Sequence, residues 1–251
     1  MAKPACLPHC TVKWHLPLDI MIEEEARGRA NIRTMEAKVH ELPLFPLNVV
    51  LFPGQTLPLH IFEPRYRVMI QKCMNDNVPF GVVLAQNEEP DEPFDVGTSA
   101  RVTELKKIPD GRLNIVSMGE ERFRLHDWRT SEHGYLIGDV TAFPFAEDET
   151  PDAITTGLVS RRLRKYLRLL AKANGVRFKF DQFPTDPTEI AWFAAIALRL
   201  PLDGKQQLLS QDRLSGLLSI ESDMLGEELK MMSIVESAIR PPDDGNAFSR
   251  N

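Results

Sequence analysis

Residues 41–84 read ELPLFPLNVVLFPGQTLPLHIFEPRYRVMIQKCMNDNVPFGVVL, and this stretch decides the fold. Its first half consists of short apolar runs interrupted by proline. Such runs predict extended strands at a sheet edge, because proline cannot donate a ladder hydrogen bond. The Pro53-Gly54 pair closes one run and predicts a turn, since proline fixes φ and glycine accepts a positive φ. The ordered part of the chain therefore opens with strands.

The spacing of apolar residues changes after Phe62. Pro64 suits the first position of a helix, and Glu63 suits the N-cap before it. Apolar residues then recur with helical spacing at Tyr66, Met69, Ile70, Cys73 and Met74. The polar run 75–77 predicts the end of this helix, and residues 80–86 read as a buried strand.

Further strand signals follow the first helix. Residues 87–95 are polar and acidic, which predicts a loop. Pro109-Asp110-Gly111 between two β-rich runs is typical of a hairpin turn. The runs with strand character cover residues 98–105, 113–116, 122–125 and 135–143. Many short strands with one early helix predict a rolled or barrel-like sheet.

After residue 151 the pattern becomes helical. An apolar stripe predicts the first of these helices, at Ile154, Leu158, Leu163, Tyr166, Leu167 and Leu170. The run 186–189 (DPTE) is a capping box that predicts a second helix, and Asp203 predicts the start of a third. A last helix is expected from Leu214 to Val235, before Pro241.

These patterns predict an α+β protein. Residues 1–36 are expected to be disordered, or to follow from a start codon assigned too far upstream, because their apolar residues lack any period. We expect a β subdomain over residues 37–148, a helical subdomain over residues 149–240 and a flexible tail over residues 241–251.

Composition narrows the function classes. The chain has 251 residues, a net charge of −6 and three cysteines. A negative charge disfavours non-specific binding to nucleic acid or an anionic membrane. Three cysteines are too few for a disulfide framework, and no apolar run approaches the roughly 20 residues that span a bilayer. We therefore expect a cytoplasmic protein that does not bind membranes.

Motifs of catalysis are missing from the sequence. It contains no phosphate-binding P-loop, dinucleotide fingerprint, nucleophile elbow or zinc-protease helix. We therefore predict no enzyme activity and no cofactor. Cys6, His9 and Cys10 lack a second ligand pair, so no metal site is predicted. Cys73 lies on an apolar helix face and is expected to be a small buried side chain.

One helix carries a run of cations. The expected basic face consists of Arg161, Arg164, Lys165 and Arg168. A solvated helix surface and a contact site for RNA or an acidic partner both explain this run. No interleaved aromatic residues accompany it, as single-strand binders usually require, and this favours the solvated surface.

The stretch 61–84 closely resembles the Lon N-terminal domain, the substrate-recognition domain that precedes the ATPase and protease domains of Lon. The segment LPLFPLNVVLFPG at residues 42–54 also resembles that family. Later matching phrases occur at residues 97–104, 110–115, 122–124, 200–202 and 205–209. The resemblance spans residues 39–235 and ends before any ATPase or protease segment, so we expect a standalone Lon-domain protein lacking both.

The resemblance implies a PUA-like β roll or pseudo-barrel with one early helix, followed by an α-helical bundle. It implies a noncatalytic module that recognises unfolded or degron-bearing polypeptides, with a protease or chaperone as a further partner and an adaptor or chaperone-like role in quality control. The expected peptide contacts are Phe62, Arg65, Tyr66 and Phe80, although core packing also explains the aromatic residues. Two alternatives stay open: a PUA-like RNA-binding protein, and a peptidase accessory subunit that carries the Lon name by homology.

Overall fold

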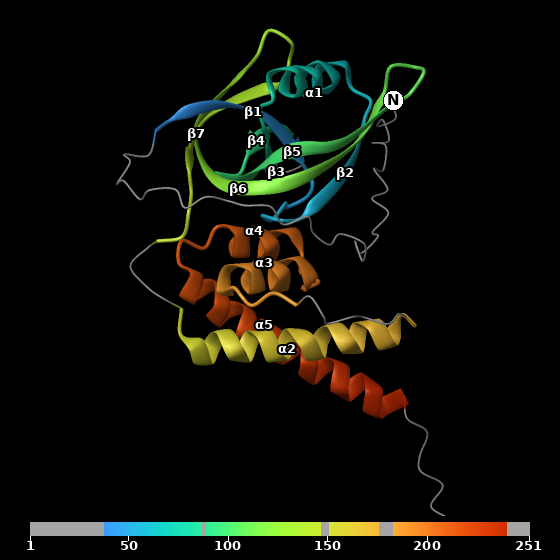
Figure 1. Cartoon of the computed structure of the whole chain (residues 1–251), viewed down its shortest axis with the longest axis vertical. Helices are drawn as coiled ribbons and strands as arrows, with labels where there is room; N and C mark the ends of the chain where they lie inside the picture. The colour runs from blue at the N-terminus through green and yellow to red at the C-terminus, as the bar shows by residue number, and fades with distance from the viewer. Residues whose placement is uncertain (1–37, 87–88, 147–150, 176–182, 240–251) are drawn as a thin grey trace, which may run out of the picture. The chain divides into compact units, whose positions relative to one another are not determined.

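The computed structural model begins with strands β1 (His40–Leu47) and β2 (Thr56–Ile61), helix α1 (Pro64–Asp76) and strand β3 (Phe80–Gln86) (Figure 1). The structure describes residues 38–86, 89–146, 151–175 and 183–239. The predicted N-terminal extension, with its Cys6 and Cys10, and the predicted tail at 241–251 therefore lie outside the described residues.

Strands β4 (Glu89–Pro93), β5 (Val96–Lys107), β6 (Leu113–Thr130) and β7 (Leu136–Ala142) complete a seven-stranded sheet. Its order is β1-β7-β6-β5-β3, and β1 also pairs with β3 in parallel, so these strands close into a barrel. Strand β2 is added beside β6, and β4 beside β3. The predicted rolled sheet is thus confirmed.

Strand β6 is one continuous strand of 18 residues where the sequence predicted two. Gly119 separates the two predicted runs, but here it serves a close approach of the backbone. A Cβ at this position would lie 2.5 Å from the carbonyl oxygen of Phe52. The amide of Gly119 donates to the carbonyl of Gln55 at 2.9 Å, and its own carbonyl accepts from Gly54 at 2.8 Å. Glycine here joins the strand to the Pro53-Gly54 turn.

The acidic segment 87–95 was predicted as a loop, and for its middle part this is wrong. Residues Glu89–Pro93 form β4, which pairs with β3 in an antiparallel register. Backbone pairing at the end of a sheet needs little strand propensity, and proline is tolerated on an edge strand. The polar, acidic composition of this segment therefore gave no indication of a strand.

Helix α1 begins and ends where the sequence indicated. Pro64 is its first residue, and Asn77 caps its C-terminal end with a left-handed backbone at φ 52°. The predicted capping role of the Glu63 side chain is wrong: Glu63 holds the N-cap position but makes no capping hydrogen bond. Its carboxylate instead accepts from Nε of Arg65 at 2.9 Å.

The inner face of α1 packs against the barrel interior. Tyr66, Met69, Ile70 and Cys73 are buried there with Phe45 and Phe80. The rings of Phe45 and Tyr66 stack with centroids 4.1 Å apart. Burial raises the pKa of the Cys73 thiol to about 11, which confirms the expectation of a buried side chain and keeps the thiol protonated.

Helices α2 (Ala153–Ala173), α3 (Pro187–Ala197), α4 (Leu202–Leu209) and α5 (Leu214–Ile239) follow the barrel (Figure 1). The predicted cap at Asp186 is confirmed, since its carboxylate accepts from the amides of Thr188 and Glu189. The predicted start of a helix at Asp203 is wrong, because α4 begins after Pro201. Ile154 is 79% exposed and so does not join the predicted apolar stripe. No helix in the described part of the chain is long and apolar enough to cross a membrane.

The barrel and the helices share one apolar cluster within the compact unit Glu36–Asn251. Val50, Phe52 and Leu84 of the barrel side belong to the cluster that contains Trp192 and Leu208 of the helices. Polar contacts cross the same boundary. The side-chain Nε2 of Gln206 donates to the carbonyl of Val96 at 2.9 Å, and the backbone amide of Ala146 donates to the carbonyl of Asp212 at 2.9 Å.

Arg122 of β6 is the most deeply embedded charge at this boundary. Its side chain donates to the carbonyl oxygens of Leu209 at 2.8 Å and Gln211 at 2.5 Å. Its guanidinium also lies over the rings of Phe143, Phe145 and Trp192, at 4.6, 4.1 and 5.1 Å. Burial lowers its pKa to about 10, so the guanidinium stays charged at neutral pH. The α+β architecture predicted from the sequence is confirmed.

Candidate functional site

The outer face of helix α1 carries apolar side chains that the barrel does not cover. Val68 is 39% exposed and Met74 is 41% exposed, although the buried face of the same helix is fully packed. Val68 lies out of phase with the buried residues 66, 69, 70 and 73. An apolar residue on the solvent side of a short helix is a candidate contact for another chain.

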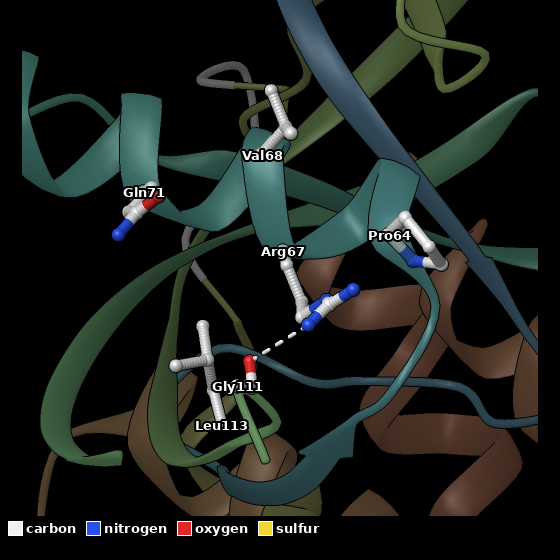
Figure 2. Close-up of a pocket in the computed structure, with 6 residues that line it drawn as sticks. All are labelled: Pro64, Arg67, Val68, Gln71, Gly111 and Leu113. Carbon is white, nitrogen blue, oxygen red and sulfur yellow. Dashed lines mark hydrogen bonds between the residues drawn. The ribbon is translucent and has the colours of Figure 1, made fainter. Parts of the chain in front are cut away.

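A hollow of about 240 Å³ lies beside Val68. It runs between α1 and the turn that joins β5 to β6, as Figure 2 shows. Its lining residues are Pro64, Arg67, Val68, Gln71, Gly111 and Leu113. We call this feature the α1 hollow. Its walls combine three apolar side chains with a guanidinium and an amide, the mixture typical of a small recognition pocket.

Arg67 joins the two sides of the α1 hollow. Its Nη1 donates to the carbonyl oxygen of Gly111 at 3.1 Å, the contact drawn in Figure 2. Gly111 has a φ of 84°, which glycine accepts without strain. The buried Nε of Arg67 has no hydrogen-bond partner among the described residues. The hydrogen bond that Arg67 makes across the hollow is therefore to a backbone carbonyl and not to an acidic side chain.

Polar side chains on the neighbouring turn and strand form a connected chain. Arg112 pairs with Asp110 at 2.6 Å, and this contact lowers the pKa of the Asp110 carboxyl. Arg112 Nη1 also lies 3.3 Å from Nε2 of His60, whose Nδ1 lies 2.6 Å from Oδ1 of Asn114. These contacts hold the turn next to β2.

Two of the four predicted peptide contacts lie on the surface. Phe62 is 51% exposed, and its ring stacks with His60 at 6.3 Å between centroids. Arg65 is half-buried between Glu63 and the carbonyl of Gly134, which its Nη1 reaches at 3.3 Å. Tyr66 and Phe80, in contrast, are buried in the barrel core, so neither presents its ring to solvent.

Sequence reasoning missed most of the α1 hollow. Arg67 and Gly111 lie 44 positions apart in the chain, and only the closed barrel brings them together. One signal was visible in the sequence: Val68 is an apolar residue off the buried stripe of its helix. The helical spacing alone is enough to single out such a residue as a candidate surface contact.

A second, larger hollow of about 400 Å³ lies between α2 and α3. Its lining residues are Pro151, Ala153, Thr156, Gly157, Ser160, Arg164, Pro184, Thr185, Pro187 and Ile190. We call it the α2–α3 hollow. Among the described residues that line it, the charged one is Arg164, whose guanidinium lies 3.8 Å from the ring centroid of Phe183. That group is already engaged within the fold.

The predicted basic face divides into different environments. Arg161, Lys165 and Arg168 are exposed on α2, whereas Arg164 is half-buried at the α2–α3 hollow. Arg162, between them, donates from Nη1 to Oγ of Ser222 at 2.7 Å and so links α2 to α5. Part of the basic run therefore serves helix packing.

No three histidine, cysteine or acidic side chains come together as a candidate metal centre in the described ranges. The only cysteine in those ranges is the buried Cys73.

The fold places the chain in one structural class, a closed β-barrel with one inserted helix that is joined to a helical bundle. Residues 41–226 match the family model of the ATP-dependent protease La (LON) substrate-binding domain. The chain belongs to this family.

Full-length relatives and solved structures agree with this assignment. The chain is 27% identical over 219 residues to Lon protease 1 of Hydrogenovibrio crunogenus, covering 82% of this chain and 27% of that protein. Against Lon protease of Anaeromyxobacter dehalogenans it is 26% identical over 211 residues, covering 79% and 25%. The chain thus spans about a quarter of the length of these relatives.

The crystal structure of a Lon N-terminal domain protein from Xanthomonas campestris is similar with a TM-score of 0.57 and 28% identity, covering 72% of this chain and 95% of that one. The N-terminal domain of Mycobacterium avium complex Lon protease has the same fold, with a TM-score of 0.57 and 19% identity over 75% of this chain and 99% of that one.

Proposed function

We propose that this chain is a noncatalytic recognition domain that binds unfolded or degron-bearing polypeptides and presents them to a protease or chaperone. The family match supports this proposal, because it covers the substrate-binding domain alone. The supporting observation in the fold is the α1 hollow, with Val68 exposed beside it and Phe62 exposed two residues before α1.

Helix α1 is fixed by four buried side chains, so its outer face keeps its shape without a partner. A preformed apolar contact loses little conformational entropy on binding. An extended polypeptide can place single apolar side chains against such a surface, while its backbone stays in water.

Fluorescence anisotropy with a labelled, permanently unfolded polypeptide tests the proposal. We expect saturable binding in the micromolar range without ATP, and no cleavage of the polypeptide during the titration. Suppression of the aggregation of a heat-unfolded client would support the chaperone-like role. An absence of saturable binding across several unfolded polypeptides would overturn the proposal.

Matched variants locate the binding surface. Phe62→Ser removes an exposed ring on the proposed surface, and Met231→Asp changes an exposed residue on α5 as the control. We expect weaker binding for the first and wild-type binding for the second. Cleavage that co-purifies with the chain through every step would favour a peptidase role instead.

A further inference from the structure

The α1 hollow combines apolar walls with cations that the fold leaves unneutralised. Pro64, Val68 and Leu113 supply the apolar surface, and Arg67 supplies a charged group within the lining. The only acceptor for the Arg67 side chain within the described part of the chain is the Gly111 carbonyl. A carbonyl carries no net charge, so the positive charge of Arg67 is not cancelled there.

The strand register adds a second cation on the same side. Lys107 of β5 pairs directly with Leu113 of β6, which lines the hollow. Directly paired residues of neighbouring strands point to the same face of a sheet. Lys107 is exposed and forms no ion pair with any described residue, so its ammonium faces solvent on the side of Leu113.

The charge of this region is opposite to that of the whole chain. Residues 63–76 and 104–113 contain six lysines and arginines against four acidic residues, while the chain carries a net charge of −6. Two of those acids, Glu63 and Asp110, are already paired with Arg65 and Arg112. An acidic ligand is therefore repelled by the average surface and attracted to this one.

We propose that the α1 hollow binds an extended polypeptide segment in which one apolar residue is flanked by aspartate or glutamate. The apolar side chain lies against Val68 and Leu113, and the flanking carboxylates pair with Arg67 and Lys107. This inference rests on the proposed function and names its substrate class. Because the cations lie on both α1 and β5, the surface fits several side-chain carboxylates better than a single chain terminus.

Fluorescence anisotropy with four labelled peptides tests this inference. The first places a leucine between aspartates, the second replaces the aspartates by asparagine, and the third replaces them by lysine. All three have amidated C-termini, and a fourth peptide repeats the second with a free C-terminal carboxylate. We expect the first to bind at least tenfold more tightly than the others, with an affinity that falls as salt is added.

Charge reversal separates this site from the rest of the surface. Lys107→Glu should weaken the binding of the acidic peptide about tenfold and leave the binding of the asparagine peptide unchanged. Lys230→Glu on α5 makes the same change of charge at another exposed lysine and should have no effect. Val68→Ser should weaken the binding of both peptides, because it removes an apolar wall of the hollow and adds no charge beside Arg67.

The possible outcomes distinguish a failure of the acidic-segment inference from a failure of the proposed function. Binding of an unfolded polypeptide with no preference among the peptides overturns the acidic-segment inference and leaves the proposed function standing. An absence of binding to any polypeptide overturns both. Tight binding of only the free C-terminal carboxylate, or displacement of the acidic peptide by a short RNA with the same dependence on Lys107, also overturns the inference.

Discussion

The barrel side and the helical side each bury a charged residue, and they treat it in opposite ways. Arg122 of β6 is 5% exposed and has two carbonyl acceptors and three aromatic rings around it. Glu221 of α5 is 0% exposed, and neither of its carboxylate oxygens has a partner in the described ranges. Burial raises the pKa of Glu221 well above its usual value.

The contrast between Arg122 and Glu221 shows which buried charges stabilise the fold. A buried charge that donates to backbone carbonyls fixes the geometry of its neighbours, because losing it leaves those carbonyls unsatisfied. A buried carboxyl without partners stabilises nothing when it is charged. Arg122 therefore holds the barrel to the helices, whereas Glu221 makes the helical side sensitive to pH.

The two hollows also differ in the partners of the arginine that lines each of them. In the α1 hollow, the only hydrogen-bond acceptor of the Arg67 side chain among the described residues is a neutral carbonyl. In the α2–α3 hollow, Arg164 already lies against the ring of Phe183. The cation of the larger hollow is thus already engaged by an aromatic ring, and volume alone does not identify a binding site.

Replacing Arg122 should have the largest effect on stability. In Arg122→Met the carbonyls of Leu209 and Gln211 lose a charged donor, and the rings of Phe145 and Trp192 lose the cation that lies over them. We expect the free energy of unfolding to fall by about 3–4 kcal/mol. Urea unfolding followed by tryptophan fluorescence and by circular dichroism measures this.

Arg124→Met is the control for that variant. Arg124 lies two residues along β6, is half-buried, forms a 3.4 Å ion pair with Asp95 and lies 4.3 Å from the ring centroid of Phe143. Its removal should cost less than about 1 kcal/mol. Equal losses for the two variants would refute the special role of Arg122.

Gly119→Ala should be the next most damaging change. The new Cβ would lie 2.5 Å from the Phe52 carbonyl, so the strand or the turn must shift. We expect a loss of about 2–3 kcal/mol. Gly157→Ala on α2 is the matched variant, since no atom lies within 4 Å of its Cβ. Its free energy of unfolding should rise by about 0.5–1 kcal/mol, because alanine has a higher helix propensity than glycine.

The pH dependence of unfolding should reveal Glu221. Because its pKa is raised in the folded state, the folded chain holds a proton that the unfolded chain releases. Its contribution to stability is present below the usual glutamate pKa and falls as pH rises toward the raised pKa, by up to about 1.4 kcal/mol per pH unit.

Unfolding curves between pH 4 and 8 should show this slope in the wild type and lose it in Glu221→Gln. The exposed Glu227 of α5 provides the control, and Glu227→Gln should leave the slope unchanged. A wild type whose stability does not decline in this range more than that of Glu221→Gln would contradict the prediction.

The smallest effect on stability should come from Val68→Asp. Val68 is 39% exposed and belongs to none of the buried apolar clusters, so we expect a change in stability within about 0.5 kcal/mol. Thermal unfolding measures it. A loss above about 2 kcal/mol would mean that Val68 belongs to the core rather than to a binding surface.

The sequence predicted the elements better than their contacts. Pro64, Asn77 and Asp186 mark helix ends through local chemistry, and the structure confirms all three. Strand β4 was missed because its pairing with β3, and not its composition, makes it a strand. The continuity of β6 through Gly119 was missed for a related reason: the close approach to Phe52 that requires glycine is a tertiary contact.

The candidate site was predicted only in part. The strand–helix junction drew attention to Phe62 and Arg65, and both lie at the surface. Tyr66 and Phe80 were proposed with them, but helical and strand periodicity place both on buried faces. The partnership of Arg67 with Gly111 depends on barrel closure, which no local pattern encodes.

Hydrogen exchange of the chain with and without a bound unfolded polypeptide tests the central claim most directly. We predict slower exchange on binding in α1 and in the turn at residues 108–113, with no change in residues 151–164 of the α2–α3 hollow. Protection confined to the α2–α3 hollow, or no protection at α1 under saturating polypeptide, would contradict the assignment of the α1 hollow as the recognition site.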